Sequence, residues 1–346
     1  MKSNLRRLHA SAALVALSLA TLAVSHARGV TIDWVTVGNP GNTADTSPSG
    51  YGSVAESFQI MKFEFTNSQY TQFLNSIDPS GTNPNTVYNN NMSSNARGGI
   101  SFTIGNADGA KYAVRSNMGD KPVNYVSWFD AARVANWLMN GATSSSSTET
   151  GAYTLNNATS GNAVAVNSGA TFFIPTENQW YKAAYYKGGS TNAGYWDYAT
   201  QSDSGPASVT ADSTTGNGSA GSAGNFANYS LAADWNGQDG NVTTVGTNGG
   251  ASAYGAFDMS GNVYEWNDLS GAAGSLVGIR GGGWSYSAFD LSSSSRYQFN
   301  PSFEGNDTGF RLASPVPEPA TLGMASGGAL CAGGWWVLKR RRRART

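Results

Sequence analysis

Most of the structural information in this sequence is concentrated in Gly255-Ala-Phe-Asp-Met-Ser-Gly-Asn-Val-Tyr-Glu-Trp266. Asp258 and Glu265 flank Ser260-Gly-Asn262, a turn-forming run that lets the chain bend back on itself. A bent segment with a carboxylate at each end can surround a hard cation such as calcium, which takes about 6–8 oxygen ligands, backbone carbonyls included. A glycine turn whose acids cap nearby amides explains the same spacing, so the residues alone leave both interpretations open.

The composition around this segment is that of a loop-rich domain. The chain has 346 residues, of which 43 are glycine and only 12% are charged. This length is enough for one large domain with a substantial core. Low charge and many turn residues are more typical of an extracellular protein than of a helical cytosolic one.

The formal net charge of -1 conceals an acidic middle. Three of the basic residues lie within residues 1–27 and six lie after Leu338, which leaves 12 basic residues against 22 acidic ones between them. A nucleic-acid partner requires a basic face, so we expect none. An acidic domain suits divalent cations.

Histidine and cysteine are missing from the same middle region. His9 and His26 lie near the start, and the single cysteine is Cys331. Residues 28–314 therefore contain no disulfide, no thiolate and no imidazole. A Ser-His-Asp triad is excluded there as well.

Helix-start signals occur at three places. Thr66 with Gln69, Ser127 with Asp130, and Thr176 with Gln179 each have a capping residue followed three positions later by a side chain that can complete a capping box. Apolar residues follow each at helical spacing. We expect the first helix to end at Asp78-Pro79 and the second at Asn140-Gly141.

Strand composition appears in three short segments, 33–37, 57–65 and 171–174. Residues 142–169 are low in complexity and predict a long surface insertion that can hold a short hairpin. Residues 202–225 predict another flexible polar stretch. Few regular elements among long loops predict an α+β domain whose aromatic side chains mostly pack in the core.

Five ordered motifs resemble those of the formylglycine-generating enzyme family, also called the sulfatase-modifying factor family. The central one is Asp258-Met-Ser-Gly-Asn-Val-Tyr-Glu-Trp266. The others are Pro122-Val-Asn-Tyr-Val-Ser-Trp-Phe-Asp130, Ile174-Pro-Thr-Glu-Asn-Gln-Trp180, Arg280-Gly-Gly-Gly-Trp284 and Gly309-Phe-Arg311. The resemblance runs from about Ile32 to Ala313, and it implies the family's loop-rich fold, one related to C-type lectins.

Two structural calcium sites are implied by the resemblance. Carried over by motif, the first consists of the Asn228 side chain, the Tyr229 carbonyl, the Asp239 side chain and the Asn241 carbonyl. The second consists of Asp258, the carbonyls of Gly261 and Val263, and Glu265. We expect calcium at the second site at least, because two bound ions would stabilise loops that no disulfide can hold.

The family's oxidase chemistry is not expected in this chain. Family members that oxidise a substrate cysteine use two cysteines near the segment after Arg-Gly-Gly, where copper binds, whereas residues 280–296 contain none. Thiolates are what select Cu(I), so we expect no copper. The histidines that hold iron in another branch of the family are missing too. Ser285, Ser287 and Asp290 are weak candidates for another chemistry.

Three arginines, Arg280 and Arg311 in the matching motifs and Arg296 in the segment after Arg280, are expected to be structural, each contacting a carboxylate or carbonyls. Trp284, Ser285 and Arg296 are candidates for a binding cleft.

The two ends have the patterns of targeting segments. Arg6 and Arg7, an apolar run and Ser25-His-Ala27 predict a signal peptide over residues 1–27. Residues 315–346 contain Pro317-Glu-Pro319, an apolar run over 320–338 long enough to cross a bilayer, and an arginine cluster expected to stay cytoplasmic. This tail resembles the PEP-CTERM sorting signal, although a plain membrane anchor also fits. The resemblance implies a Gram-negative bacterium, tail removal by an exosortase, a location at the surface or in the matrix, and an association with exopolysaccharide.

We therefore expect residues 28–314 to form an exported, calcium-stabilised domain without a catalytic centre, which binds a peptide or a glycan or serves a structural role. The alternative is an enzyme of the same family with altered, non-cysteine chemistry.

Overall fold

The computed structural model describes residues 30–47 and 50–317 as a mixed α+β, loop-rich domain. Its α-helices are α1 (Asn67–Ile77), α2 (Asn91–Ser94), α3 (Trp128–Met139) and α4 (Glu177–Tyr185), and its 3-10 helices are η1 (Pro84–Thr86) and η2 (Ala288–Leu291). The proposed signal peptide over residues 1–27, the span over 320–338 and nearly all of the sorting tail lie outside this description. No helix within the described ranges is both long and apolar enough to cross a membrane.

The strands are all short. They are β1 (Trp34–Val37), β2 (Phe58–Met61), β3 (Ile100–Phe102), β4 (Tyr112–Val114), β5 (Ala207–Ser208), β6 (Phe226–Ala227), β7 (Tyr264–Asn267), β8 (Val277–Arg280), β9 (Tyr297–Phe299), β10 (Thr308–Gly309) and β11 (Ala313–Pro315).

The helices begin where their capping residues predict. Thr66, Ser127 and Thr176 each accept a hydrogen bond from the backbone of the residue three positions later, and that residue's side chain accepts one from the cap's own backbone. The first helix ends at Ile77 before Asp78, and α3 ends at Met139 before Asn140. These three helix predictions are confirmed.

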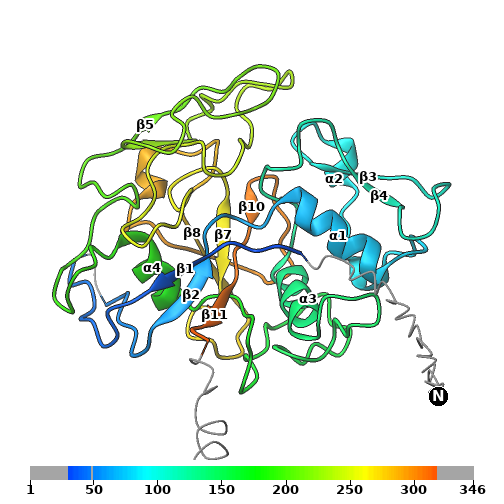
Figure 1. The fold of residues 1–346 in the computed structure, drawn as a ribbon, viewed down its shortest axis with the longest axis horizontal. Coiled ribbons are helices and arrows are strands. Elements are labelled where there is room, and N and C mark those ends of the chain that lie inside the picture. Colours follow the sequence, from blue (N-terminus) through cyan, green and yellow to red (C-terminus); the bar gives the residue numbers. More distant parts are fainter. Residues whose placement is uncertain (1–29, 48–49, 318–346) are drawn as a thin grey trace, which may run out of the picture.

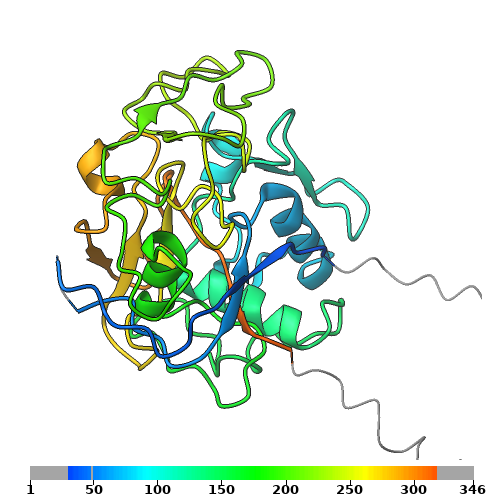
Figure 2. The ribbon, with the colours of Figure 1, turned by 60° about the vertical axis from the view of Figure 1, so that its left-hand side comes forward.

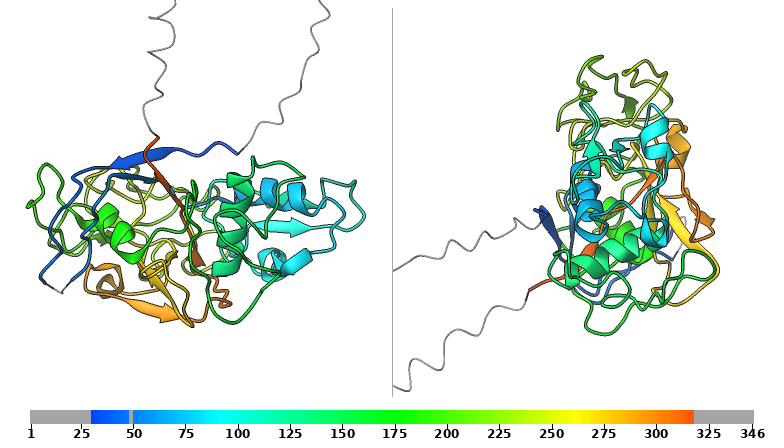
Figure 3. Two further views of the ribbon diagram at one scale, coloured as in Figure 1. Left: turned by 90° about the horizontal axis from the view of Figure 1, so that it is seen from below. Right: turned by 90° about the vertical axis from the view of Figure 1, so that its right-hand side faces the viewer.

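Two sheets organise the chain. β1, β2 and β11 form an antiparallel sheet that joins the first and last described segments, which therefore lie on one side of the domain (Figure 3). The second sheet has the order β10-β7-β8-β9, with β10 parallel to β7 and the other pairs antiparallel. In Figure 1 this sheet lies between α4 on one side and α1 and α3 on the other.

Of the three segments predicted to be strands, two form paired strands and one does not. Residues 33–37 and part of 57–65 pair as β1 and β2. The apolar segment 171–174 forms only an isolated bridge between Phe173 and Ala313. Buried aromatic rings supply much of the core, as expected, including Trp128, Trp137, Trp180 and Trp266.

Loops cover one end of the domain. Residues from about 200 to 250, shown green to yellow at the top of Figures 1 and 2, contain only the two-residue strands β5 and β6. The stretch expected to be flexible, 202–225, carries backbone hydrogen bonds such as Val209 N–H to Ala227 O (2.9 Å) and Ala207 N–H to Asn225 O (3.0 Å).

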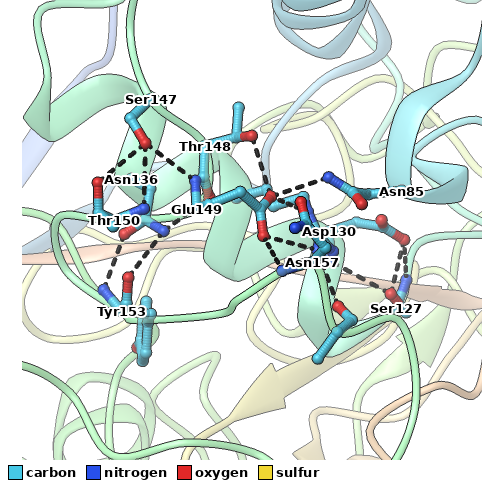
Figure 4. A network of polar contacts seen from close by, with 12 residues as sticks. Asn85, Ser127, Asp130, Asn136, Ser147, Thr148, Glu149, Thr150, Tyr153 and Asn157 are labelled. Atoms are coloured by element: carbon cyan, nitrogen blue, oxygen red, sulfur yellow. Dashed lines mark hydrogen bonds and ion pairs between the residues drawn. The ribbon is translucent and has the colours of Figure 1, made fainter.

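The low-complexity segment 142–169 is anchored to α3 through Glu149, and it contains no hairpin of paired strands within the described residues. The Glu149 carboxylate accepts hydrogen bonds from Arg133 Nε (2.8 Å), Asn85 Nδ2 (3.0 Å) and the Asn157 backbone N–H (2.7 Å), as Figure 4 shows in part. Asn136 on α3 holds the same segment by donating to the carbonyls of Thr148 and Tyr153. One buried helix face therefore orders a segment whose composition predicts only a loop.

Candidate functional site

The central motif is a tight turn followed by β7. Asp258, Gly261 and Asn262 all have left-handed backbone angles, with φ of 57°, 87° and 67°. A side chain at Gly261 would lie 2.4 Å from the Asn228 carbonyl oxygen, so only glycine fits. The turn therefore packs directly on the loop that contains the first expected calcium set.

Glu265 pairs with a buried arginine. Arg311 donates through Nε and Nη2 to the two Glu265 carboxylate oxygens, each at 2.6 Å, and Trp180 Nε1 donates to one of them at 2.8 Å. Both members of this pair are fully buried. Burial, reinforced by Asp258 and Glu265, raises the pKa of nearby Glu64 well above its ordinary value, against the opposing effect of Arg311.

The two carboxylates of the second expected calcium set already accept hydrogen bonds from protein donors. Asp258 accepts hydrogen bonds from the Gly246 backbone N–H (2.5 Å) and from Asn248 Nδ2 (3.0 Å), and Glu265 accepts those of Arg311 and Trp180. The hydrogen bonds offset only part of the burial of Asp258, because burial still holds its pKa above the ordinary value. Within the described ranges, no three His, Cys, Asp or Glu side chains converge as a metal site.

One side-chain oxygen of the first expected set has no protein donor. Asn228 is completely buried, and its Nδ2 donates to the Asn241 carbonyl at 2.8 Å, while its Oδ1 has no hydrogen-bond partner. A buried oxygen without a donor is costly unless a donor or a cation meets it. Tyr229 adjoins Asn228 in the chain, whereas Asp239 is exposed and its carbonyl accepts a hydrogen bond from Arg97.

The three arginines are structural, as expected. Arg280 and Arg296 both contact Glu177 at the start of α4, at 2.8 and 2.7 Å, and Arg280 also donates to the carbonyls of Ser293 and Ser295. Arg311 holds Glu265.

The expected binding-cleft residues have separate partners. Trp284 is buried among Met118, Trp235, Val242 and Val263, with the Arg97 guanidinium 4.2 Å from a ring centroid. Arg296 instead lies beside Glu177 and near the Tyr51 ring. Ser285 is half-buried, and no hydrogen bond to its side chain is formed. Nothing in the described structure brings these three side chains together.

A cavity of about 240 Å³ lies beside the second sheet, and none of these three residues lines it. It is lined by Tyr264, Ile279, Tyr286, Asp290, Tyr297 and Phe299. Ile279 pairs with Tyr297 across β8 and β9, and Trp266 pairs with Ile279 across β7 and β8. Because alternate residues of a strand share a face, Tyr264, Ile279, Tyr297 and Phe299 lie on one face, and Glu265 and Arg280 lie on the other.

The segment 281–296 forms the rest of the cavity wall. η2 presents Asp290, whose carboxylate accepts hydrogen bonds from Ser287 Oγ (2.7 Å) and Tyr297 OH (2.9 Å). Burial by itself would raise the pKa of Asp290, but these bonds outweigh it and the pKa lies below the ordinary value. Asp290 is therefore an anion at neutral pH. Ser287 is its capping partner, and residues 28–314 contain no histidine that could activate the Ser287 hydroxyl.

The signal for this cavity in the sequence was the alternation of Tyr297 and Phe299 on β9, with Tyr264 on β7, from which β8 separates it. It could not be interpreted without knowing that β7, β8 and β9 are neighbours.

Comparison with known proteins gives one family and several similar folds. The model of the sulfatase-modifying factor enzyme 1-like domain (FGE-sulfatase) matches residues 34–316. The solved structure of CarF is 21% identical, with a TM-score of 0.49, over 83% of this chain and 99% of CarF. Treponema denticola variable protein 1 is 19% identical, with a TM-score of 0.48, over 84% of this chain and 99% of that one.

PvdO from Pseudomonas aeruginosa is also similar, at 19% identity and a TM-score of 0.41, over 82% of this chain and 92% of PvdO. No curated protein matches the chain.

Proposed function

The chain belongs to the sulfatase-modifying factor enzyme 1-like family, and we propose that it is a binding module of that family without oxidase activity. The observation that carries the proposal concerns residues 281–296. The family resemblance assigns the copper-binding cysteines to this segment, which here contains no cysteine and supplies Tyr286 and Asp290 to a cavity wall. Where the resemblance implies a copper centre, this chain has an aromatic and acidic cavity wall.

Catalysis by the hydroxyls of this segment has little support. Ser287 donates to Asp290, and neither histidine nor cysteine occurs between residues 28 and 314 to activate it. Tyr264 and Tyr297 are held protonated, because burial raises the pKa of the first, and the hydrogen bond to Asp290, with burial, raises the pKa of the second.

The proposal is tested by oxygen consumption. The purified protein is mixed with copper(I) and a cysteine-containing peptide, and oxygen uptake and aldehyde formation are measured. We expect neither to rise above the rate of copper with peptide alone. Turnover that depends on the protein would reject the binding module and favour the alternative, an enzyme of altered chemistry.

Calcium at the first set, Asn228, Tyr229, Asp239 and Asn241, is part of the proposal. Its support is the unpartnered, buried Asn228 Oδ1. The residues would supply amide, carbonyl and carboxylate oxygens, which are the ligands that calcium prefers.

We also propose export with the domain outside the cytoplasm. The support is the sequence pattern of residues 1–27 and 315–346, which implies a Gram-negative host and processing by an exosortase. The acidic middle of the chain suits neutral or cationic ligands, with exopolysaccharide or peptide as candidates, better than nucleic acid. The family resemblance implies a relation to C-type lectins, and such a relation would agree with a binding role.

A further inference from the structure

We propose that the cavity beside β7 and β9 is an aromatic box that binds a small organic cation, of the quaternary or methylated ammonium class. This inference rests on the proposed binding function and specifies its ligand. The cavity, about 240 Å³, lies below the range of about 300–1,000 Å³ usual for drug-sized ligands, so it suits a small head group.

The walls have the geometry that such a cation needs. The rings of Tyr264 and Tyr286 are 4.9 Å apart at 80°, and those of Tyr264 and Tyr297 are 5.9 Å apart at 86°. A cation held over an aromatic face within about 6 Å gains from the ring quadrupole, and several faces surrounding one site add their effects. Edge-to-face pairs are also common in cores, but here the rings border open space.

The charge around the box is negative and uncompensated. Asp290 lies in the wall, and Asp307 is close enough to raise the pKa of both Tyr286 and Tyr264. In the part of the chain that the structure describes, no salt bridge engages either carboxylate, and the cavity lining contains no Lys or Arg. A ligand anion would be repelled, whereas a cation would be attracted.

A polar atom inside the wall is also left without a partner. Tyr264 is 2% exposed, and its hydroxyl forms no well-made hydrogen bond, although it lies close enough to Asp290 to help lower that carboxyl's pKa. Buried hydroxyls are normally satisfied. Because this hydroxyl is buried in the protein, a ligand in the cavity does not reach it, and the aromatic rings and Asp290 carry the proposal.

Other ligand classes fit less well. A sugar needs many polar partners, but the Ser287 and Tyr297 hydroxyls are already engaged with Asp290. A calcium ion needs about 6–8 oxygens, and Asp290 is the one carboxylate in the lining. A neutral apolar ligand would give no reason for an anionic side chain in the wall.

The test compares choline with 3,3-dimethylbutan-1-ol, its neutral isostere, by saturation-transfer NMR and calorimetry on the full chain at constant ionic strength. We expect choline to bind at least tenfold more tightly than the isostere. Equal binding of the two, or no choline binding up to about 100 mM, would overturn the cation inference.

Substitutions in the cavity wall test whether choline binds in this cavity. Tyr297→Leu should weaken choline binding about tenfold or more, because it removes one aromatic face, whereas Tyr297→Phe keeps the face and should stay within about threefold. Phe289→Leu is the matched control, since Phe289 is 62% exposed and does not line the cavity. Thermal melts confirm that each variant is folded. If Tyr297→Leu binds choline as well as the wild type, the box is not the site.

The two proposals can fail separately. Failure of choline alone removes the cation assignment and leaves the binding module standing, whereas protein-dependent oxygen uptake removes the binding module.

Discussion

At the scale of single residues, Arg311 has the largest predicted effect on stability. Replacing it with methionine leaves Glu265 fully buried without its cation, and breaking a buried pair in this way costs about 3–5 kcal/mol. Urea unfolding of Arg311→Met measures the loss. Lys187→Ala is the control, since the Lys187–Asp203 pair is 3.7 Å long and partly exposed. Losing this pair and the contact of Lys187 with the Trp196 ring should cost about 1 kcal/mol or less. Equal losses in the two variants would contradict the structural role of Arg311.

Asp268 makes stability depend on pH. Burial raises its pKa to about 7, despite hydrogen bonds from Tyr153 and Trp128, whereas an unfolded aspartate titrates near about 3.9. The folded state therefore binds more protons between these values, and the stability that this group contributes at low pH is lost as pH rises from about 4 to about 7. Asp130, whose pKa burial raises to about 6, acts in the same direction.

Asp268→Asn should flatten this dependence. A single group changes the free energy of unfolding by about 1.4 kcal/mol for each pH unit over which its protonation differs between states. We expect the variant's unfolding free energy to fall less than the wild type's between pH 4.5 and 7.5, in urea titrations at several pH values. Asp108→Asn, at a carboxylate that is 76% exposed, is the matched control. Parallel pH profiles for the wild type and Asp268→Asn would refute the assignment.

At the scale of elements, the three long helices depend on their first residues. The Thr176 hydroxyl accepts from the Gln179 backbone (3.3 Å), and the Gln179 carboxamide accepts from the Thr176 backbone (2.9 Å). Thr176→Ala removes one of these bonds and should destabilise the protein by about 1 kcal/mol, whereas Thr176→Ser keeps it and should cost only a few tenths. Equilibrium unfolding measures the free energy of unfolding of both variants. If Thr176→Ser loses as much of it as Thr176→Ala, the capping interpretation is wrong.

The helices were predictable because their signals are local. A cap, its partner three residues later and an apolar stripe all lie within one short segment, and the structure places each helix start at the expected residue. The β10-β7-β8-β9 sheet was not predictable. Its strands are two to four residues long, and β10 joins β7 from more than forty positions away. Such segments carry too little periodicity to be recognised before their neighbours are known.

The same difference applies to the site. The motifs located the important segments, including the loop after Arg280 and the turn before Glu265. They did not show which face of β7 and β9 a side chain occupies, so the cavity lined by Tyr286 and Tyr297 could not be predicted. The sequence indicates Glu265 as a calcium ligand. In the structure its carboxylate pairs with the guanidinium of Arg311, which belongs to the later motif Gly309-Phe-Arg311. Pairings between distant motifs are set by the whole fold.

At the scale of the whole molecule, the domain combines long loops with few regular elements and, between residues 28 and 314, no disulfide-forming cysteine. Loop order then depends on side-chain hydrogen bonds such as those of Glu149 and Asn228. A ligand that binds only the folded state adds stability of RT ln(1 + [L]/Kd), about 2.7 kcal/mol at a hundredfold excess over Kd. Calcium bound at the first set would therefore show in thermal unfolding.

We expect millimolar calcium to raise the melting temperature above that in EDTA, and magnesium to raise it less, because magnesium demands a stricter geometry. Asp239→Asn tests the first set without disturbing a buried group, since Asp239 is exposed. It should reduce the calcium-dependent shift and leave the melt in EDTA unchanged. Asp258→Asn tests the second set, whose carboxylates already have protein donors, and should leave the shift intact. If Asp258→Asn loses the calcium-dependent shift and Asp239→Asn keeps it, the ion binds at the second set. If the wild type shows no shift, calcium does not stabilise this fold.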